Sequence, residues 1–191
     1  MRLFVALEIP AAVRDNLAAL LKDFRSLSSR LADRCPRWVR PENLHVTLKF
    51  IGEVAGEKLD GIRTALSEVR SDGPVDLRFR GLGFFPAEEN PGVLWVGLDA
   101  SRNLAALAAD IDRALEPEGV ARDRREFAPH LTLARFEPPG VYEDLRAAIR
   151  QRAQREFGSF QAREFLLIES KLKPSGAEYT SLASFRLTVE P

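Results

Sequence analysis

The same order of secondary-structure patterns occurs twice along this 191-residue chain, and this duplication constrains the fold most strongly. Apolar spacing in the first half predicts a strand, a helix, extended segments, a second helix and an alternating strand. The second half predicts strand, helix, strand, helix and strand again, followed by a last strand. In chain order, the predicted segments are 2–9, 13–31, 38–39 and 44–51, 59–69, 75–80, then 93–98, 104–115, 130–136, 143–149, 165–168 and 179–189.

This pattern predicts an α+β protein of one bilobal domain, which is consistent with its length. We expect two interlocked repeats, approximately 1–85 and 91–173, with the C-terminal strand near 179–189. Each of two pseudo-symmetric lobes would be a mainly antiparallel sheet with helices on its outer face. An active-site cleft would then lie between the two sheets.

Side-chain identity between the repeats is low except at one place, the strand that begins with a histidine. His45 begins the sequence HVTL and His130 begins HLTL, and the chain has no other histidine. Since threonine occupies about one position in twenty, threonine two places after both histidines would arise by chance in about one case in four hundred. The paired motifs therefore indicate a functional site.

Strand geometry places each histidine and its threonine on one face, because alternate residues point the same way. His45 and Thr47 share one face, and His130 and Thr132 share another. If the lobes face each other, two imidazoles and two hydroxyls converge. Histidine suits acid and base roles near neutrality, so one neutral and one protonated imidazole across a phosphate would suffice without a metal. The threonine hydroxyls would donate to its oxygens.

The overall composition limits which binding partners and which cellular environment are expected. The 28 basic residues balance 28 acidic ones, so a non-specific nucleic-acid coat protein is disfavoured, and any nucleic-acid contact must be local. The single cysteine excludes an internal disulfide. The apolar N-terminus is short and contains Glu8 and Pro10, which indicates a strand and not a signal peptide. We expect a cytoplasmic monomer without membrane contact.

Several longer stretches resemble one known family over essentially the whole chain. They read RLFVALEIP, WVRPENLHVTLKFIGE, GLGFFP leading into VLWVGL, FAPHLTLARF and SKLKPSGAEYTSLASFRL. In order and spacing these segments are similar to those of the 2H phosphoesterase superfamily, which is named for its two histidine motifs. Within it, the chain resembles the bacterial and archaeal RNA 2′,3′-cyclic phosphodiesterases, historically called 2′-5′ RNA ligases.

The resemblance implies hydrolysis of RNA 2′,3′-cyclic phosphodiester ends to 2′-phosphomonoesters, with no metal or other cofactor. It assigns His45 as the proton donor to the leaving 3′ oxygen and His130 as the proton acceptor from water. From the residues alone the two roles are interchangeable. The reverse reaction would join RNA ends through a 2′-5′ bond, although in about 55 M water hydrolysis should dominate.

Three further residues are candidates for substrate binding. Strict alternation places Lys49 on the face of His45 and Thr47, where it would approach the phosphate or else lie in solvent. The resemblance assigns Arg135 a phosphate contact, but alternation places it on the opposite face. A β-bulge or a strand end must therefore precede it. Tyr179 could stack on a base or be a buried edge aromatic residue.

Three other interpretations remain at this point. The substrate could be another cyclic or 2′-5′ nucleotide, such as ADP-ribose 1″,2″-cyclic phosphate. The chain could instead be an RNA-end-binding module without turnover, although a pure binder has no need for two imidazoles. A metal site is disfavoured, because zinc usually takes three or four histidine, cysteine or carboxylate ligands.

Overall fold

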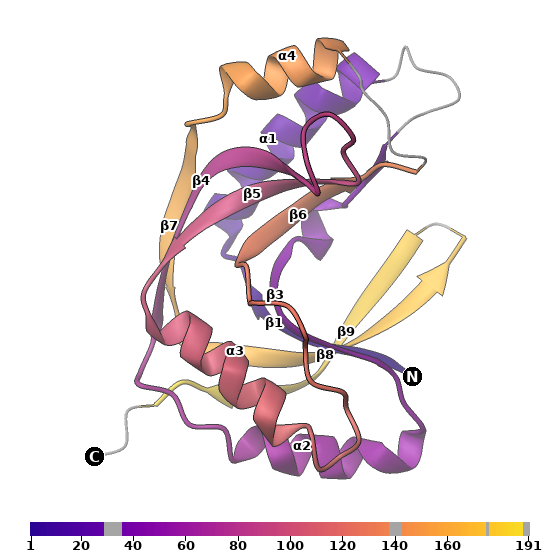
Figure 1. Cartoon of the computed structure of the whole chain (residues 1–191), viewed down its shortest axis with the longest axis vertical. Coiled ribbons are helices and arrows are strands. Elements are labelled where there is room, and N and C mark those ends of the chain that lie inside the picture. The colour runs from indigo at the N-terminus through magenta and orange to yellow at the C-terminus, as the bar shows by residue number, and fades with distance from the viewer. Residues whose placement is uncertain (29–35, 138–142, 175, 189–191) are drawn as a thin grey trace.

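Two antiparallel sheets face each other across the molecule, and helices cover their outer sides (Figure 1). The computed structural model describes residues 1–28, 36–137, 143–174 and 176–188. Within these residues, no helix is both long and apolar enough to cross a membrane.

The four-stranded sheet has the strand order β3-β1-β8-β9, with all neighbours antiparallel. Two helices, α2 and α3, lie on its outer side, together with the 3-10 turn Gly56–Lys58 (Figure 1). The bounds are β1 Arg2–Glu8, β3 His45–Glu53, β8 Glu164–Lys173, β9 Gly176–Arg186, α2 Leu59–Ser67 and α3 Asn103–Ala114.

The five-stranded sheet has the order β2-β6-β5-β4-β7 and is also antiparallel throughout. Its outer side is covered by α1 and α4, while the 3-10 turn Pro41–Asn43 leads from β2 into β3. The bounds are β2 Arg37–Trp38, β4 Val75–Phe85, β5 Val93–Ala100, β6 His130–Arg135, β7 Glu156–Ala162, α1 Ala11–Ser28 and α4 Glu143–Gln151.

The four strands β3-β1-β8-β9 correspond in order to β6-β5-β4-β7, and β2 is an additional edge strand of the five-stranded sheet. Both sheets combine strands from the first and second halves of the sequence. The helices also cross over: α1 follows β1 but packs beside β7, and α3 follows β5 but packs beside β3. The predicted α+β fold, with two pseudo-symmetric antiparallel lobes, outer helices and a cleft between the sheets, is confirmed.

Apolar residues fill the space between each sheet and its helices, because strand alternation sends them to the outer face of the sheet. A separate, smaller apolar cluster lies on the inner face of the four-stranded sheet. Its members are Phe4, Ala6, Leu166 and Ile168, with Tyr179 packed against them. This cluster forms an apolar floor beside the first histidine.

The structure departs from the predicted elements in three strands, of which β8 continues past the predicted end at 168 to Lys173. Strand β7 was not predicted, because Gly158 and Ser159 interrupt the apolar alternation between its phenylalanines. Strand β4 continues past 80 to Phe85 through two glycines, which weaken a strand signal. The predicted ends at 29–31 and at 189 lie outside the described residues.

Candidate active site

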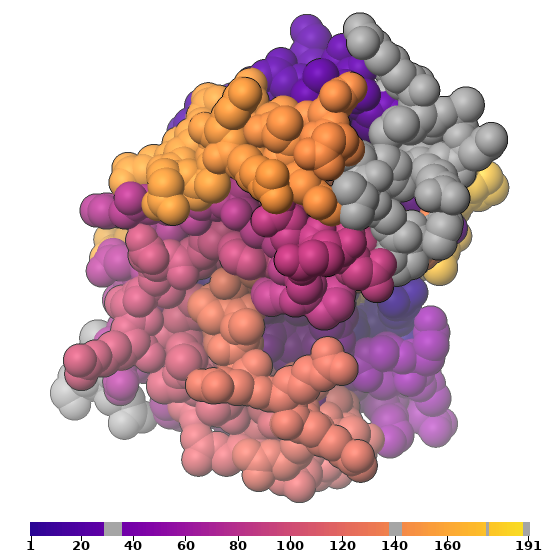
Figure 2. All heavy atoms as spheres, turned by 45° about the horizontal axis from the view of Figure 1, so that its top comes forward, coloured from indigo at the N-terminus to yellow at the C-terminus, as the bar shows by residue number. Residues whose placement is uncertain are grey.

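The two histidines begin the corresponding strands β3 and β6, whose residues contact each other across the cleft. His130 lies close enough to His45 that its positive charge lowers the pKa of the His45 imidazole. Figure 2 shows the surface hollowed between the magenta segments near residues 80–95 and the salmon segment near 115–130. The fold therefore joins the two sequence motifs in one site.

Both imidazoles are held in the same way by the backbone. Nδ1 of His45 lies 2.7 Å from the carbonyl oxygen of Asn43, and Nδ1 of His130 lies 2.8 Å from that of Ala128. A carbonyl oxygen can only accept, so each Nδ1 must carry the hydrogen. Each Nε2 is thus left to accept a proton when the ring is neutral and to donate one when it is protonated.

Aromatic rings enclose the first histidine. The ring of Phe4 lies 4.8 Å from that of His45, and Tyr179 meets it edge-on at 5.3 Å. This burial is the main cause that lowers the pKa of His45 from its usual 6.5, since it penalises the charged form. The hydrogen bond to Asn43 raises that pKa in part, and the charges of Arg135 and His130 lower it further.

The ring of His130 is surrounded by other residues than the ring of His45. Phe85, at the end of β4, meets the ring of His130 edge-on with centroids 5.1 Å apart. Phe85 packs in turn against Trp95, which pairs with Thr132 on the neighbouring strand. The indole ring of Trp95 lies over Gly83, where a methyl group would come within 2.3 Å of it. The wall beside His130 is therefore built from aromatic rings at van der Waals distance.

A β-bulge occurs at the same place in both histidine strands. In β3, Thr47 and Lys49 pair with consecutive residues of β1, which leaves Leu48 without a partner there. In β6, Thr132 and Ala134 pair with consecutive residues of β5, so Leu133 is the additional residue. Both strands accordingly share the burial pattern of half-buried, buried, half-buried, buried, buried and exposed. Each bulge reverses the faces of the residues that follow it.

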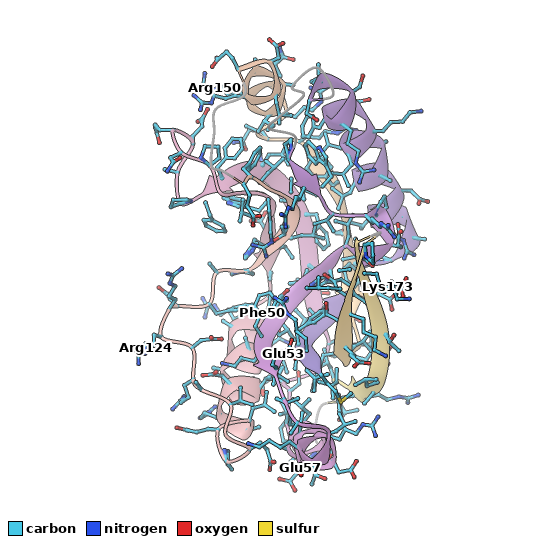
Figure 3. The ribbon with its side chains drawn as sticks, turned by 90° about the vertical axis from the view of Figure 1, so that its right-hand side faces the viewer. Phe50, Glu53, Glu57, Arg124, Arg150 and Lys173 are labelled. Atoms are coloured by element: carbon cyan, nitrogen blue, oxygen red, sulfur yellow. The ribbon has the colours of Figure 1, made fainter. Side chains whose placement is uncertain are left out.

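The bulge at Leu133 turns Arg135 to the face of His130 and Thr132. The role that the resemblance assigns to Arg135 required a bulge or a strand end before it, and the bulge is present. The charge of Arg135 lowers the pKa of both His45 and Tyr179, which places its guanidinium near the opposite sheet. In the other strand the equivalent position is Phe50, which is 59% exposed and lies near mid-height in Figure 3.

The prediction that Lys49 shares the face of His45 is wrong. Alternation was extended through Leu48, whereas the bulge there turns Lys49 to the outer face of the sheet. Its ammonium is buried and pairs with Asp112 at 2.5 Å and with Asp123 at 3.2 Å. Lys49 therefore lies behind the cleft and not against it.

Several polar side chains lie near the two histidines. In the part of the chain that the structure describes, no side-chain hydrogen bond or ion pair involves Thr47, Thr132, Arg135 or the Tyr179 hydroxyl. Burial raises the pKa of Tyr179, so its hydroxyl stays protonated at neutral pH. These groups could therefore all donate hydrogen bonds to an anion bound between the imidazoles.

Of the aromatic residues at the site, sequence reasoning found Tyr179 but missed three phenylalanines. Phe4 and Phe85 contact the two imidazoles, and Phe50 lies beyond the bulge on the His45 face. Phe4 could have been found from the alternation of β1, which sends it to the face opposite Leu3 and Val5. Phe50 could not, because nothing in the sequence located the bulge before it.

Among the described residues, no three histidine, cysteine, aspartate or glutamate side chains are grouped as metal ligands are. The paired histidines, with an arginine beside them, instead define the class of a two-histidine phosphoester site. A family model described as the 2'-5' RNA ligase superfamily matches residues 10–173. The chain belongs to this superfamily.

Similar proteins from two archaea support this placement. The chain is 36% identical over 185 residues to an RNA 2',3'-cyclic phosphodiesterase of Archaeoglobus fulgidus, covering 97% of this chain and 99% of the relative. It is 32% identical over 188 residues to the enzyme of that name in Methanothermobacter thermautotrophicus, covering 98% and 99%.

Solved structures share the whole fold. A Thermus thermophilus protein superposes with a TM-score of 0.76 at 29% identity, covering 98% of both chains. E. coli LigT complexed with 3'-AMP superposes with a TM-score of 0.74 at 26% identity, again covering 98% of both chains.

Proposed function

We propose that this protein hydrolyses RNA ends that carry a 2′,3′-cyclic phosphate and leaves a 2′-phosphomonoester. Water attacks the phosphorus while the bond from phosphorus to the 3′ oxygen breaks. His130 accepts the proton from water through Nε2, and His45 donates a proton from Nε2 to the departing 3′ oxygen. The reaction then needs only two positioned imidazoles in complementary protonation states.

The main support for this proposal is that the imidazole rings of His45 and His130 are held by the same kind of backbone hydrogen bond. Each Nδ1 donates to the carbonyl oxygen two residues earlier, at 2.7 Å for His45 and 2.8 Å for His130. This fixes the tautomer of both rings and reserves both Nε2 atoms for the reaction. A protein that only bound RNA ends would have no use for two imidazoles prepared in this way.

Proton donation by His45 requires the bound substrate. Burial lowers the pKa of His45, so in the free protein this ring is mainly neutral at pH 7. A cyclic phosphodiester carries one negative charge, which favours the imidazolium when it binds nearby. Substrate binding would therefore charge the donor that the reaction needs.

The remaining polar groups stabilise the charge that develops on the phosphate. Arg135 offers a planar guanidinium that can bind two non-bridging oxygens at once. Thr47 and Thr132 flank the histidines on the same faces and donate from their hydroxyls. Tyr179, whose ring packs against Phe4 and His45, would contact the terminal ribose or base.

RNA is favoured over other cyclic nucleotides because the relatives that match nearly the full chain are named RNA 2',3'-cyclic phosphodiesterases. The superfamily name also suggests the reverse reaction, in which a 5′-hydroxyl replaces water. Hydrolysis should dominate it, because water is present at about 55 M and a second RNA end competes only when it is held in place.

The test is an assay in excess chelator with a short RNA that ends in a 2′,3′-cyclic phosphate. We expect conversion to a 2′-phosphate end, identified by its resistance to a phosphatase specific for 3′-phosphates. A 3′-phosphate product would reverse the leaving oxygen and contradict the assigned geometry. Faster turnover of ADP-ribose 1″,2″-cyclic phosphate than of RNA would contradict the substrate class.

A further inference from the structure

A long connection between α3 and β6 carries His130 into the site. It begins after Ala114, on the outer side of the four-stranded sheet, and ends at His130 in the five-stranded sheet. In Figure 1 it leaves the foot of α3 beside α2 and rises across the molecule to β6. The position of His130 relative to His45 therefore depends on how this connection, residues 115–129, is held.

Lys49 binds the middle of this connection through its ammonium group. Its ammonium donates to the carbonyl oxygen of Ala121 at 2.8 Å and pairs with Asp123 at 3.2 Å. It also pairs with Asp112 on α3 at 2.5 Å, and Asp112 accepts from the backbone N–H of Asp123 at 3.2 Å. The side chains of Lys49 and Asp112 are 1% and 14% exposed, so this ion pair is largely shielded from solvent, whereas Asp123 is 62% exposed. One buried ammonium thus joins β3, α3 and the connection.

Charge at this cluster is complementary. Burial is the largest single influence on the pKa of Asp112 and raises it, but the ammonium of Lys49 and hydrogen bonds from the Asp123 backbone and Arg122 together hold that pKa below its usual range. Removing one partner of a buried ion pair is strongly destabilising, because the charge of the other partner is left buried and unpaired. The cluster therefore resists displacement of residues 121–123.

The matching connection in the other half, between α1 and β3, is held by different means. There, β2 pairs through its backbone with β6, with Trp38 opposite Ala134, and Val39 donates to the carbonyl oxygen of Leu133 at 2.8 Å. Ala134 follows the bulge in β6 as Lys49 follows the bulge in β3. The α3–β6 connection forms no such edge strand. Lys49 supplies the tether that backbone pairing supplies in the other half.

We propose that Lys49 is a positioning residue, which sets His130 against His45 by tethering the connection between α3 and β6 to the strand of His45. This inference rests on the proposed function for its kinetic consequence. The residue itself touches no substrate, because its side chain points to the outer face of the sheet.

Kinetics of Lys49→Met give the first test. A general base displaced by about 1 Å can lose about a hundredfold in rate, so we expect kcat to fall ten- to hundredfold while KM changes by less than about threefold. Lys58→Met is the matched control, because Lys58 also binds this connection, at the carbonyl oxygen of Glu118, but from an exposed position. The control should keep kcat within about twofold. A wild-type kcat in Lys49→Met, or an equal loss in the control, would overturn the proposal.

A double variant separates positioning from stability. Lys49→Met with Asp112→Leu removes both buried charges, and apolar replacement of a buried pair is often neutral or stabilising. We expect the melting temperature lost in Lys49→Met to return in the double variant, while kcat stays low because the tether is still absent. Recovery of kcat together with the melting temperature would show that Lys49 acts only on stability.

The two histidine signals give a readout that does not depend on turnover. The chain contains only His45 and His130, so their imidazole proton resonances can be assigned by replacing each in turn. In Lys49→Met we expect the His130 resonances to move more than those of His45, although His45 and not His130 is on the same strand as Lys49. The opposite result would overturn the proposal. If wild-type protein failed to hydrolyse cyclic-phosphate RNA, the proposed function would fall while this resonance test still decided the tether.

Discussion

Leu48 and Leu133 occupy the same structural position in the two halves: each is the bulged residue three places after a histidine. The bulges turn the fifth residue after each histidine back to the histidine face. That residue is Phe50 in one half and Arg135 in the other. The two halves thus share a backbone irregularity but carry different chemistry beyond it, which makes the cleft asymmetric around a symmetric pair of imidazoles.

Arg135→Gln should lower kcat/KM by about a hundredfold, because loss of one preorganised donor to developing charge typically costs about 10²–10³ in rate. Arg135→Lys should recover part of this loss, since it keeps the charge but not the bidentate geometry. Arg37→Gln is the control. Arg37 lies opposite Arg135 in the backbone register of β2 and β6, and its side chain forms an exposed ion pair with Glu137. Steady-state kinetics on cyclic-phosphate RNA decide between them, and equal losses in both glutamine variants would contradict a specific role for Arg135.

The imidazole of His45 should titrate below its usual 6.5 in the free protein, because burial penalises its charged form. Arg135→Gln should raise this pKa in part, since the arginine charge is one of its lowering causes. An NMR titration of the His45 ring protons measures both effects. An unchanged or lower pKa in Arg135→Gln would place the guanidinium away from this ring.

The same shift has a kinetic consequence when His45 is the donor. Activity is lost as pH rises through the pKa of the donor, so the falling limb of kcat/KM, which reports the free protein, should lie below 6.5. The falling limb of kcat should lie at higher pH, because the bound phosphate raises that pKa. Coincident limbs would mean that substrate binding does not charge His45.

Tyr179→Phe should behave differently from Tyr179→Ala. The phenylalanine variant keeps the ring that packs against His45 and Phe4, and it should therefore keep the low pKa of His45. The alanine variant opens the enclosure to water, so the pKa of His45 should rise towards its usual value and KM should increase. If both variants gave the same pKa of His45, the ring would have no part in burying it.

Gly83→Ala should damage the wall beside His130. A methyl group at Gly83 would lie 2.3 Å from the ring of Trp95, and the ring must move to accommodate it. Such overpacking typically costs about 1–3 kcal/mol of unfolding free energy, and it should also reduce kcat because Trp95 pairs with Thr132. Gly56→Ala, where nothing lies within 4 Å, is the control for urea unfolding and kinetics. A Gly83→Ala protein as stable and active as this control would contradict the close packing.

Much of this architecture could be predicted from the sequence, because periodicity reports which face of a strand or helix is buried. The duplicated order of elements and the shared face of each histidine and its threonine follow from that principle. The orientation of the side chains after Leu48 and Leu133 does not follow from periodicity. A bulge depends on pairing with the neighbouring strand and leaves no local signal in the sequence. Alternation therefore misplaced Lys49, while for Arg135 the resemblance had already required a bulge or a strand end.

Other features depend on contacts between distant parts of the chain. Helix α1 packs beside β7 and α3 beside β3, so each helix covers the sheet that its preceding strand does not belong to. The ion cluster of Lys49 likewise joins residues 49, 112 and 123, whose proximity no local pattern indicates. The aromatic enclosure of His45 brings together β1, β3 and β9 in the same way.

His45 and His130 act together on one phosphodiester in the proposed reaction. Hydrolysis of cyclic-phosphate RNA by His45→Ala, by His130→Ala and by the double variant is the decisive test of this joint action. Each single variant should lose at least about a thousandfold in kcat, and the double variant should lose little more, because residues that act as one unit are strongly non-additive. Losses that multiply in the double variant, or a single variant within tenfold of the wild-type kcat, would contradict a shared site.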